Sequence, residues 1–409
     1  SGESGLLRKQ GRGGVGGSRT QGLLVAAQMA MAVILLTSAG LMGRTFVQLL
    51  AVDPGFRPAE NVLTLRLTVP QATYPEAGGI VGFYDELLRR VREVPGVRRA
   101  GGARLLPLAS TMGDAGFRVE EYEPGPNEAL QAEWQWATPG YMEIMGIPLV
   151  AGRTFDERDG PEAADAVVIS RSMADRYFQG REAVGSRMVV YWDTVTVVGV
   201  VGNVAHNGIT APRKHRFYRP HAQVDVAGPS RSLTLTLETE GDPYVVLDPV
   251  RAEIRALDPS IPVAQVGSMD DVLAGAVAEQ RFSLVLVGVF AAIALALSLV
   301  GIYGVLSYAV SRRTRELGVR LALGAERGRV IGMVVRQGMA MALLGVAAGT
   351  AVALALSGFM GGMLYEVPPR DALTFVGVPL LFALVALAAC FVPALRAARV
   401  DPARALRGE

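Results

Sequence analysis

The sequence predicts a multi-pass α-helical membrane protein, with four transmembrane helices and a large mixed α/β extracytoplasmic domain between helices 1 and 2. Three observations predict this fold class. Half of the 409 residues are hydrophobic and only 19% are charged, below the roughly 25% of an average soluble domain. Four windows lack Asp, Glu, Lys, Arg and His, namely 22–43, 282–310, 337–365 and 372–395. The polar stretch between the first two windows is long enough to build its own core.

The first two elements are a linker and a membrane span. Residues 1–21 are rich in Gly and basic residues, which is typical of a flexible linker and predicts a cytoplasmic one. Because the chain begins with Ser1-Gly2, we expect a piece of a longer or processed product. Residues 22–44 are predicted to form the first transmembrane helix, because 22 apolar residues span about 33 Å and a bilayer core is about 30 Å thick.

Residues 45–281 are predicted to form the extracytoplasmic domain. Segment 61–69 alternates like a strand, and segment 76–94 places its apolar residues on one helical face before Pro95-Gly96 ends it. The same patterns predict strands at 167–169, 232–238 and 261–266, a strand pair within 187–202, and helices at 171–178 and 243–257. This alternation favours a mixed α/β domain, with a second lobe around the polar residues 110–135.

Candidate catalytic residues are few. His206, His215 and His221 lie without a HExxH or paired CxxC motif, so we expect exposed loop histidines and no metal site. The acidic residues at 120–123 are expected to form a solvated face. Trp134 and Trp136 are expected in the core, with a hydrophobic substrate surface as the alternative. Neither lysine is followed by Ser or Thr, which excludes a P-loop ATPase, and one cysteine excludes an intrachain disulfide. We therefore predict a non-catalytic subunit without a cofactor.

The remaining segments complete the predicted topology. They are helix 2 at 282–310, a cytoplasmic loop at 311–329, helix 3 at 330–361, a short outer loop at 362–371, helix 4 at 372–395 and a cytoplasmic tail at 396–409. Helix 2 would measure about 44 Å, so it must tilt or project beyond the lipid.

The distribution of Arg and Lys predicts the orientation. Segment 1–21 holds four, loop 311–329 six and tail 396–409 four, whereas segment 366–371 holds one. Positive flanks stay in the cytoplasm, so we expect both termini in the cytoplasm and the domain in the periplasm or outside. Residues 44–281 carry 24 basic and 31 acidic residues, a net charge of −7, and the rest of the chain carries 16 and 7, a net +9.

The apolar windows are also informative about what the helices do. The pairs Gly345/Gly349 and Gly358/Gly362 have the spacing that permits close helix contact, although Gly and Ala are abundant throughout these windows. No window contains an acid, a base or a histidine, groups on which ion and proton paths usually depend. This argues against a pump or carrier that moves its substrate through these helices.

Loop 311–329 is the most informative segment. Residues 315–323 favour a short helix, and Gly324 suits its C-terminus. We interpret this helix as a docking element for a cytoplasmic partner, with plain positive-inside charge as the alternative. The tail is similar in style, because Asp401-Pro402 is a good start for a last short helix.

The sequence of these segments resembles the permeases of the MacB/FtsX class of ABC transporters. The resemblance is carried by RELGVRLALGA at 315–325, VDPARALR at 400–407, and by DPGF at 53–56, NVLT at 61–64, YMEIMGIPLVAGR at 141–153 and VVGVVGNV at 197–204. The last four resemble the MacB-type periplasmic core domain. In detail the chain looks most similar to the duplicated permeases of Acidobacteria, of which it would be a carboxyl-terminal half.

The resemblance implies a mechanism and a set of partners. A separate cytoplasmic ABC ATPase dimer, which carries the ATP, would bind the loop and move the outer domain by mechanotransmission. The implied docking residues are Arg315, Glu316, Gly318, Arg320, Gly324 and Ala325. A second permease half or a homodimer, membrane lipid and a periplasmic adaptor are the other implied partners, and no nucleic acid is expected. Substrate and ATPase identity stay open.

Two other functions remain open from the sequence. An FtsX-like membrane scaffold would use its outer domain to regulate an extracytoplasmic enzyme without moving cargo. A membrane-anchored enzyme would need a nucleophile and base in the domain, and the sequence offers no such pair.

Overall fold

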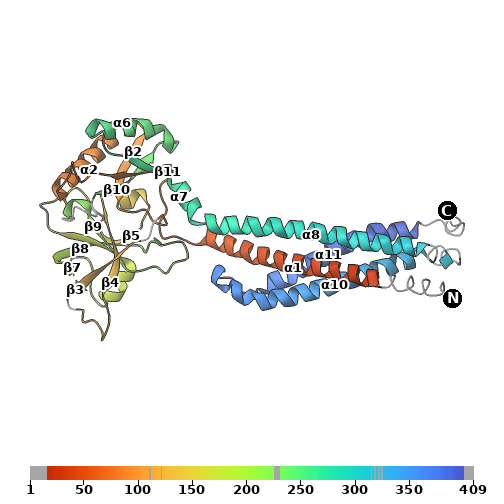
Figure 1. Cartoon of the computed structure of the whole chain (residues 1–409). Helices are drawn as coiled ribbons and strands as arrows, with labels where there is room; N and C mark the ends of the chain where they lie inside the picture. The colour runs from red at the N-terminus through yellow and green to blue at the C-terminus, as the bar shows by residue number, and fades with distance from the viewer. Residues whose placement is uncertain are drawn as a thin grey trace, which may run out of the picture. The chain divides into compact units, whose positions relative to one another are not determined.

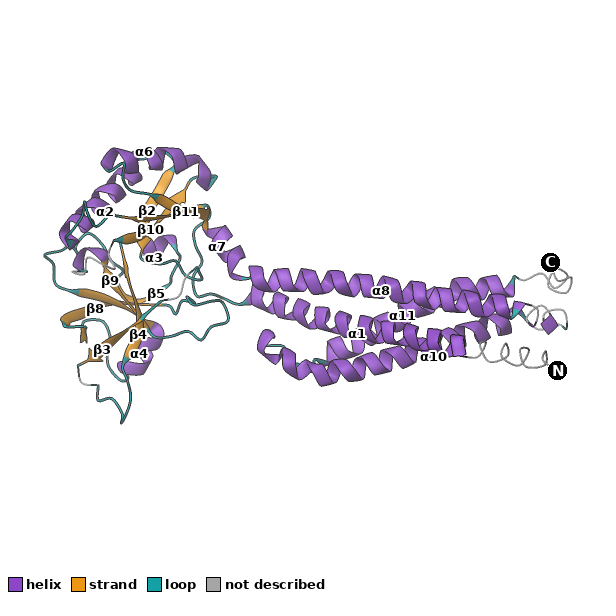
Figure 2. Cartoon of the chain, viewed as in Figure 1, coloured by secondary structure: helices purple, strands orange, loops and turns teal. Residues whose placement is uncertain are grey.

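The chain folds into two compact units. The computed structural model describes residues 16–109, 112–120, 122–224, 231–314, 316, 319–320, 323 and 326–399. We call residues 51–278 the domain unit, and residues 1–50 with 279–409 the helical unit. Figure 1 gives their elements in chain order, and Figure 2 separates the strands of the domain unit from the helices.

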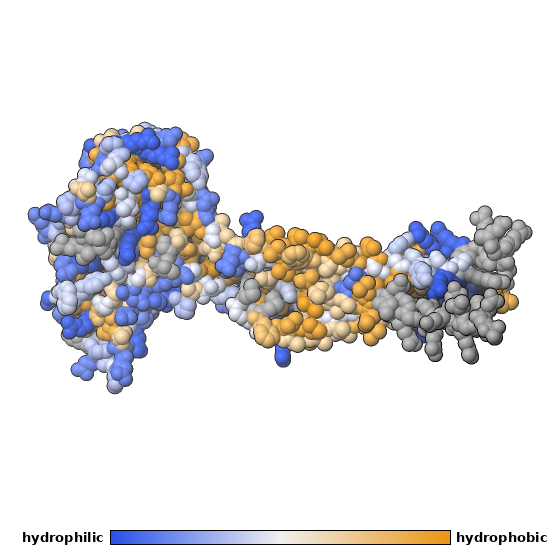
Figure 3. Space-filling view, viewed as in Figure 1, coloured by the Kyte–Doolittle hydropathy of each residue, from blue (hydrophilic) through white to orange (hydrophobic). Residues whose placement is uncertain are grey.

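The helical unit is built from four long helices. They are α1 (Gly16–Ala51), α8 (Ala278–Arg312), α10 (Arg327–Leu356) and α11 (Ala372–Ala398), with the short 3-10 helix η3 (Ser357–Met363) between the last two. Within the described residues, these four are the helices long and apolar enough to cross a membrane. Apolar side chains cover the middle of the helical unit on the face seen in Figure 3, as lipid contact requires. The predicted fold class is confirmed.

Glycines bring the helices of this unit into contact. A Cβ on Gly345 would lie 2.6 Å from the Met29 Cβ, and one on Gly349 would lie 2.7 Å from the Ala30 carbonyl oxygen. Both distances are shorter than any carbon contact, so the backbones of α10 and α1 touch here. Gly338 lies against Cys390 of α11 and Leu306 of α8 in the same way. The small residues therefore let α10 pack against the other three helices.

The second small-residue pair has a different environment. Gly358 and Gly362 lie in η3, and no atom of the described chain lies within 4 Å of a Cβ built on either. Gly345 and Gly349 therefore make the close helix contact that their spacing permits, whereas Gly358 and Gly362 make none with the described residues of this chain. The reason is that the helix gives way to a 3-10 turn before the second pair.

The described strands of the domain unit form one eleven-stranded sheet, in which β2 pairs with β4. One end of this sheet is a four-stranded antiparallel layer. Its order is β11 (Val263–Ser268), β1 (Val62–Thr68), β10 (Ser232–Thr239) and β2 (Val97–Ala103). Helices α2 (Ala77–Arg92) and α6 (Leu247–Leu257) belong to this lobe. The predicted apolar face of α2 is confirmed, because Ile80, Phe83, Leu87 and Val91 are all buried.

The other lobe is a ring of strands. It runs β4 (Gln131–Ala137), β3 (Asp114–Val119), β7 (Arg187–Val190), β8 (Asp193–Val201), β6 (Ala166–Ser170) and β9 (Arg216–Pro220), and β9 pairs again with β4. The short strand β5 (Leu149–Gly152) pairs with β8. Helices α3 (Tyr141–Ile144), α4 (Arg171–Tyr177) and the 3-10 turn η1 (His221–Gln223) connect the strands. The expected second lobe exists and extends well beyond residues 110–135.

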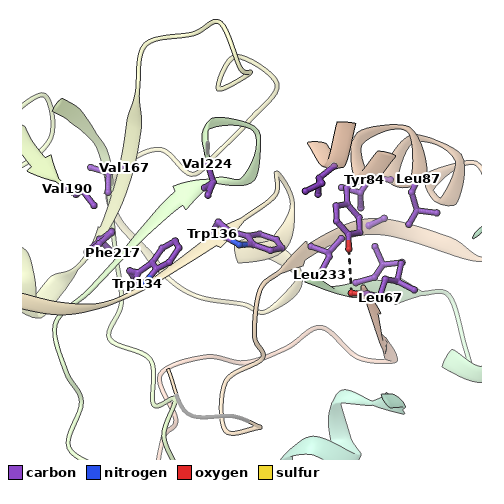
Figure 4. Close-up of a cluster of buried hydrophobic side chains, with 14 of the residues drawn as sticks. Leu67, Tyr84, Leu87, Trp134, Trp136, Val167, Val190, Phe217, Val224 and Leu233 are labelled. Atoms are coloured by element: carbon purple, nitrogen blue, oxygen red, sulfur yellow. Dashed lines mark hydrogen bonds between the residues drawn. The ribbon is translucent and has the colours of Figure 1, made fainter. Parts of the chain in front are cut away.

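The two lobes share one hydrophobic core (Figure 4). Trp134 and Trp136 of β4 are both buried, which confirms core packing. The Tyr84 hydroxyl donates a hydrogen bond to the Leu67 carbonyl at 3.4 Å and to the Arg231 carbonyl at 2.6 Å. The 3-10 turn η2 (Pro243–Val246) and the short helix α7 (Met269–Ala276) complete the unit.

Candidate partner-docking site

The predicted docking loop connects α8 to α10. Of its six candidate residues, Glu316 and Arg320 are described, and Arg315, Gly318, Gly324 and Ala325 lie outside the described residues. The Arg320 Nη2 donates to the Glu316 Oε1 at 2.6 Å, and both side chains are exposed. This is the i,i+4 pair expected on one helical turn. Both charges remain accessible to a partner.

Apolar side chains accompany this charged pair. Val319 and Leu323 are exposed, Leu323 at 83%, and the Leu323 N–H donates to the Val319 carbonyl at 3.0 Å. The Arg320 Nη1 also lies 3.5 Å from the Met333 Sδ, which connects the loop to α10. Val319 and Leu323 were not among the predicted docking residues, although their i,i+4 spacing next to the charged pair indicates an apolar surface beside it. Exposed apolar residues rimmed by charge are typical of a protein-binding surface.

Arginines near this end of the helical unit pack on tyrosines. The Arg396 Nη1 of α11 donates to the Tyr303 hydroxyl of α8 at 2.5 Å, and the Arg312 guanidinium lies 5.6 Å above the Tyr308 ring. Such contacts stabilise a cation against an aromatic face. The first of them joins α8 to α11, so a displacement of the end of α8 also acts on α11.

An ion pair joins the C-terminal part of α1 to the N-terminus of α11. The Arg44 guanidinium binds the Asp371 carboxylate, which also accepts hydrogen bonds from the Thr374 backbone N–H at 2.8 Å and the Thr374 hydroxyl at 2.7 Å. Asp371 is the N-cap of α11. The Thr374 hydroxyl, and then Arg44, lower the pKa of Asp371. This pair was not predicted because its residues lie 327 positions apart.

A buried ion pair lies inside the domain unit. The Arg216 guanidinium on β9 binds the Glu133 carboxylate on β4, and each side chain is only 3% exposed. The Asn207 Nδ2 donates to the second Glu133 oxygen at 2.6 Å. The parallel pairing of β4 with β9 places the two residues opposite each other. Because both charges are matched, the pair offers no free acid or base for catalysis, and removal of either partner would leave the other charge buried and unpaired.

The three histidines are not the exposed loop residues that we expected. His206 and His221 are buried, and His215 is partly buried with its Nδ1 3.2 Å from the Ser172 hydroxyl. The error arose because the segment around them folds into the core between β8 and β10. Burial, and then the nearby Arg216 charge, lower the pKa of His206 to about 3. No group of three or more His, Cys, Asp or Glu among the described residues is placed to hold a metal ion.

We expect His206 to make the stability of the domain unit depend on pH. Its pKa falls from 6.5 to about 3 on folding, so below pH 6.5 the unfolded chain takes up a proton that the folded chain refuses. The unfolding free energy should therefore fall by about 1.4 kcal/mol per pH unit between these two values. A His206→Leu variant should lose this slope. Tryptophan-monitored urea unfolding at about pH 7 and about pH 5 checks it, and parallel pH curves for both proteins would contradict it.

Two family descriptions match the chain. The MacB-like periplasmic core domain matches residues 25–257, and the FtsX-like permease C-terminal region matches residues 288–402. The first match covers most of α1 and the domain unit as far as the end of α6. The second covers most of α8, the docking loop, α10 and α11.

Comparisons with individual proteins give similar results. The macrolide export ATP-binding/permease protein MacB of Neisseria gonorrhoeae is 23% identical over 74% of this chain, which spans about half of that relative's length (46%). The uncharacterized ABC transporter permease YknZ of Bacillus subtilis is 23% identical over 83% of this chain and 82% of its own. The periplasmic region of MacB from Actinobacillus actinomycetemcomitans is 14% identical over 56% of this chain and 97% of its own, with a TM-score of 0.37.

Proposed function

The chain belongs to the MacB/FtsX family of ABC transporter permeases, and from this premise we propose that it couples ATP hydrolysis in a separate cytoplasmic ATPase to movement of its domain unit. It is a membrane subunit without catalysis of its own. Both termini lie in the cytoplasm, the domain unit lies outside the membrane, and the ATP is bound by the partner. The cargo is handled outside the membrane and does not cross through the helices.

The observation that carries this proposal is the surface of the docking loop. Glu316 and Arg320 present two opposite charges next to the exposed Val319 and Leu323. An apolar patch with a charged rim suits a protein partner, because the apolar part contributes affinity and the charges select orientation. The loop lies between α8 and α10, so a partner that moves it pushes on both helices.

The packing of the helical unit supports transmission of that movement. Gly345 and Gly349 hold α10 in backbone contact with α1. Close-packed helices shift as units because their interfaces deform little. Displacement of α10 therefore moves α1, which precedes the domain unit in the chain, while α8 follows the domain unit. Movement is thus transmitted from the docking loop, through the helices, to the two chain segments that connect α1 and α8 to the domain unit.

A charge-swap experiment tests the docking role. The double variant Glu316→Arg with Arg320→Glu keeps an ion pair within the helix. It exchanges the positions of the negative and the positive charge that the partner meets. We expect stimulation of the cognate ATPase by the full chain in nanodiscs to fall about tenfold, about 1.4 kcal/mol of interaction. The matched control swaps Glu86 and Arg90, another i,i+4 pair, on α2. Full stimulation and unchanged complex formation by the loop variant would refute docking through these charges.

A regulatory scaffold is the alternative function, and one observation favours it. Trp192, at the tip of the β7–β8 hairpin, is 92% exposed and lies next to the half-exposed Tyr191. Exposed aromatic residues are enriched at protein interfaces, so this tip suits an extracytoplasmic enzyme. Deletion of the gene separates the functions. Retained cargo in the cell supports the permease, whereas loss of an extracytoplasmic hydrolase activity with normal cargo export supports the scaffold.

A further inference from the structure

Helix α10 presents two arginines on its exposed side. The buried residues of α10 recur every three or four positions from Val330 to Ala353 and form its packed face. Arg329 and Arg336 are both exposed, and their spacing of seven residues places them on one line along the helix. Leu343, 52% exposed, continues this line by another seven residues. The exposed side of α10 is therefore cationic near the N-terminus and apolar farther along.

Neither arginine has a counter-ion among the described residues. Helix α10 contains three arginines and no Asp or Glu. Its N-cap, Glu326, precedes Arg329 by three positions and forms no ion pair with it. In contrast, Arg320 of the docking loop is paired with Glu316. The charges of Arg329 and Arg336 are therefore available to an anion from outside the described chain.

A glycine between the two arginines leaves the surface open. Gly332 is exposed, and a Cβ built on it would meet no atom within 4 Å. Long side chains on a helix lean toward its N-terminus, so the side chain of Arg336 leans toward the turn that contains Gly332. Room for a bulky polar group is thus left beside its guanidinium. We call the surface formed by Arg329, Gly332 and Arg336 the α10 basic face.

The length of α10 places this face at the edge of the lipid. The candidate span 327–359 has 33 residues, about 50 Å, whereas the hydrocarbon core of a bilayer is about 30 Å thick. Leu356, the last residue of α10, lies about 20 residues from Arg336, a rise of about 30 Å. With its apolar part in lipid, α10 therefore holds Arg336 at the boundary between hydrocarbon and headgroups. Figure 3 shows the same change from apolar to hydrophilic side chains along the helical unit.

Lipid phosphates are the anions present at this depth. A guanidinium at the edge of the hydrocarbon is costly without an anion beside it, and arginine binds a phosphate group through two parallel hydrogen bonds. A zwitterionic headgroup also brings a cation, for which the α10 basic face offers no carboxylate. A headgroup with a net negative charge suits this face better, because clustered arginines attract anionic lipids at a membrane surface.

We propose that the α10 basic face binds the headgroup of an anionic phospholipid, whose acyl chains lie along the apolar residues that follow Arg336. The phosphate is held by Arg336 and Arg329, and Gly332 provides the space for the rest of the headgroup. This inference goes beyond the function proposed above. It concerns the lipid next to the chain and requires no ATPase, so the two proposals stand or fall separately.

A local fluorescent reporter tests the headgroup preference. Ala340→Trp places a tryptophan at an exposed position one turn beyond Arg336, where brominated acyl chains quench it on contact. The full chain in phosphatidylcholine nanodiscs receives brominated phosphatidylglycerol or, at equal mole fraction, brominated phosphatidylcholine. The signal of the same chain without the reporter is subtracted. We expect phosphatidylglycerol to be enriched about fivefold at the reporter, the effect of one arginine near the surface.

Matched variants identify the cause of the enrichment. In the reporter chain, Arg336→Gln should remove most of it, and Arg336→Lys, which keeps the charge, should retain it. Arg399→Gln removes the same charge from the exposed C-terminal end of α11 and should leave the enrichment unchanged. A second reporter, Leu354→Trp, lies on the same side of α10 about 27 Å farther along and should show no preference between the two lipids.

Four results would overturn the proposal. Equal quenching of the Ala340→Trp reporter by the two lipids would mean that no headgroup is preferred. Equal enrichment after Arg336→Gln, or equal loss after Arg399→Gln, would mean that the attraction is spread over the whole surface. Quenching by neither lipid would mean that a second copy of the chain covers this face.

Discussion

Replacing Glu133 by alanine is expected to lower the unfolding free energy of the domain unit by about 3–5 kcal/mol. The variant leaves the Arg216 guanidinium 3% exposed with no opposing charge, in the ring of strands where water cannot replace the carboxylate. All three tryptophans of the chain, Trp134, Trp136 and Trp192, belong to this unit. Their emission during urea unfolding of the full chain therefore reports the domain unit without interference from the helices.

Two companion variants define the cause of this effect. Asp114→Ala removes the half-exposed pair between Asp114 of β3 and Lys214, which precedes β9, and a pair of this kind contributes about 0–1 kcal/mol. The double variant Glu133→Met with Arg216→Met removes both buried charges, so it should recover most of the loss. If Glu133→Ala were no worse than Asp114→Ala, the buried pair would have no special role in stability.

Leucine at Gly349 is expected to separate α1 from α10. Its Cβ would lie 2.7 Å from the Ala30 carbonyl oxygen and 2.9 Å from the Ala30 Cα. Backbone atoms cannot rotate away, so the helices must move apart, at a cost of about 1–3 kcal/mol or more. The only cysteine, Cys390, is fully buried among the helices. Faster labelling of Cys390 by a thiol-reactive fluorophore, in detergent and on heating, measures the loosening.

The chain supplies its own control for this substitution. Gly358→Leu changes a glycine of the second pair, which has the same spacing but open space around it. We expect its Cys390 labelling rate to match that of the parent chain. Equal labelling of the Gly349→Leu and parent proteins would mean that the contact between α1 and α10 does not hold the unit together.

The membrane-spanning helices were predictable because placing a charge in lipid is costly, so the segments that form them lack charged residues. Their ends were less predictable. Helix α1 continues to Ala51, past the charge-free window and past Arg44, because backbone hydrogen bonds tolerate a charged residue once the helix leaves lipid. Strand β1 and the apolar face of α2 followed from strand and helix periodicity, which local burial imposes.

Strand β2 could not be predicted by the same reasoning. Its sequence contains Gly101 and Gly102, which disfavour strands. A Cβ on Gly101 would lie 2.7 Å from the Tyr141 backbone nitrogen, and one on Gly102 would lie 2.8 Å from the Thr234 carbonyl oxygen. The glycines are needed for close approach of other segments, and a single sequence does not reveal such contacts before the fold is known.

The candidate sites also differ in how far the sequence predicts them, depending on whether their residues are close together in the chain. Glu316 and Arg320 lie within one short motif, so the resemblance of that motif to the family was enough to single them out. The partners of Glu133 and Asp371 lie 83 and 327 positions away. Local sequence patterns carry no information about contacts between residues that lie far apart in the chain. The burial of His206 and His221 escaped prediction for the same reason.

Contacts among three aromatic rings have a mechanical consequence for the domain unit. His221 lies 5.3 Å from the Tyr84 ring of one lobe and 4.4 Å from the Trp136 ring of the other, measured between centroids. The first pair meets edge to face and the second is tilted. With a common core beneath them, the lobes cannot slide past each other without separating these rings. We therefore expect the two lobes to move together as one rigid body, so that a movement of the domain unit leaves its internal geometry unchanged.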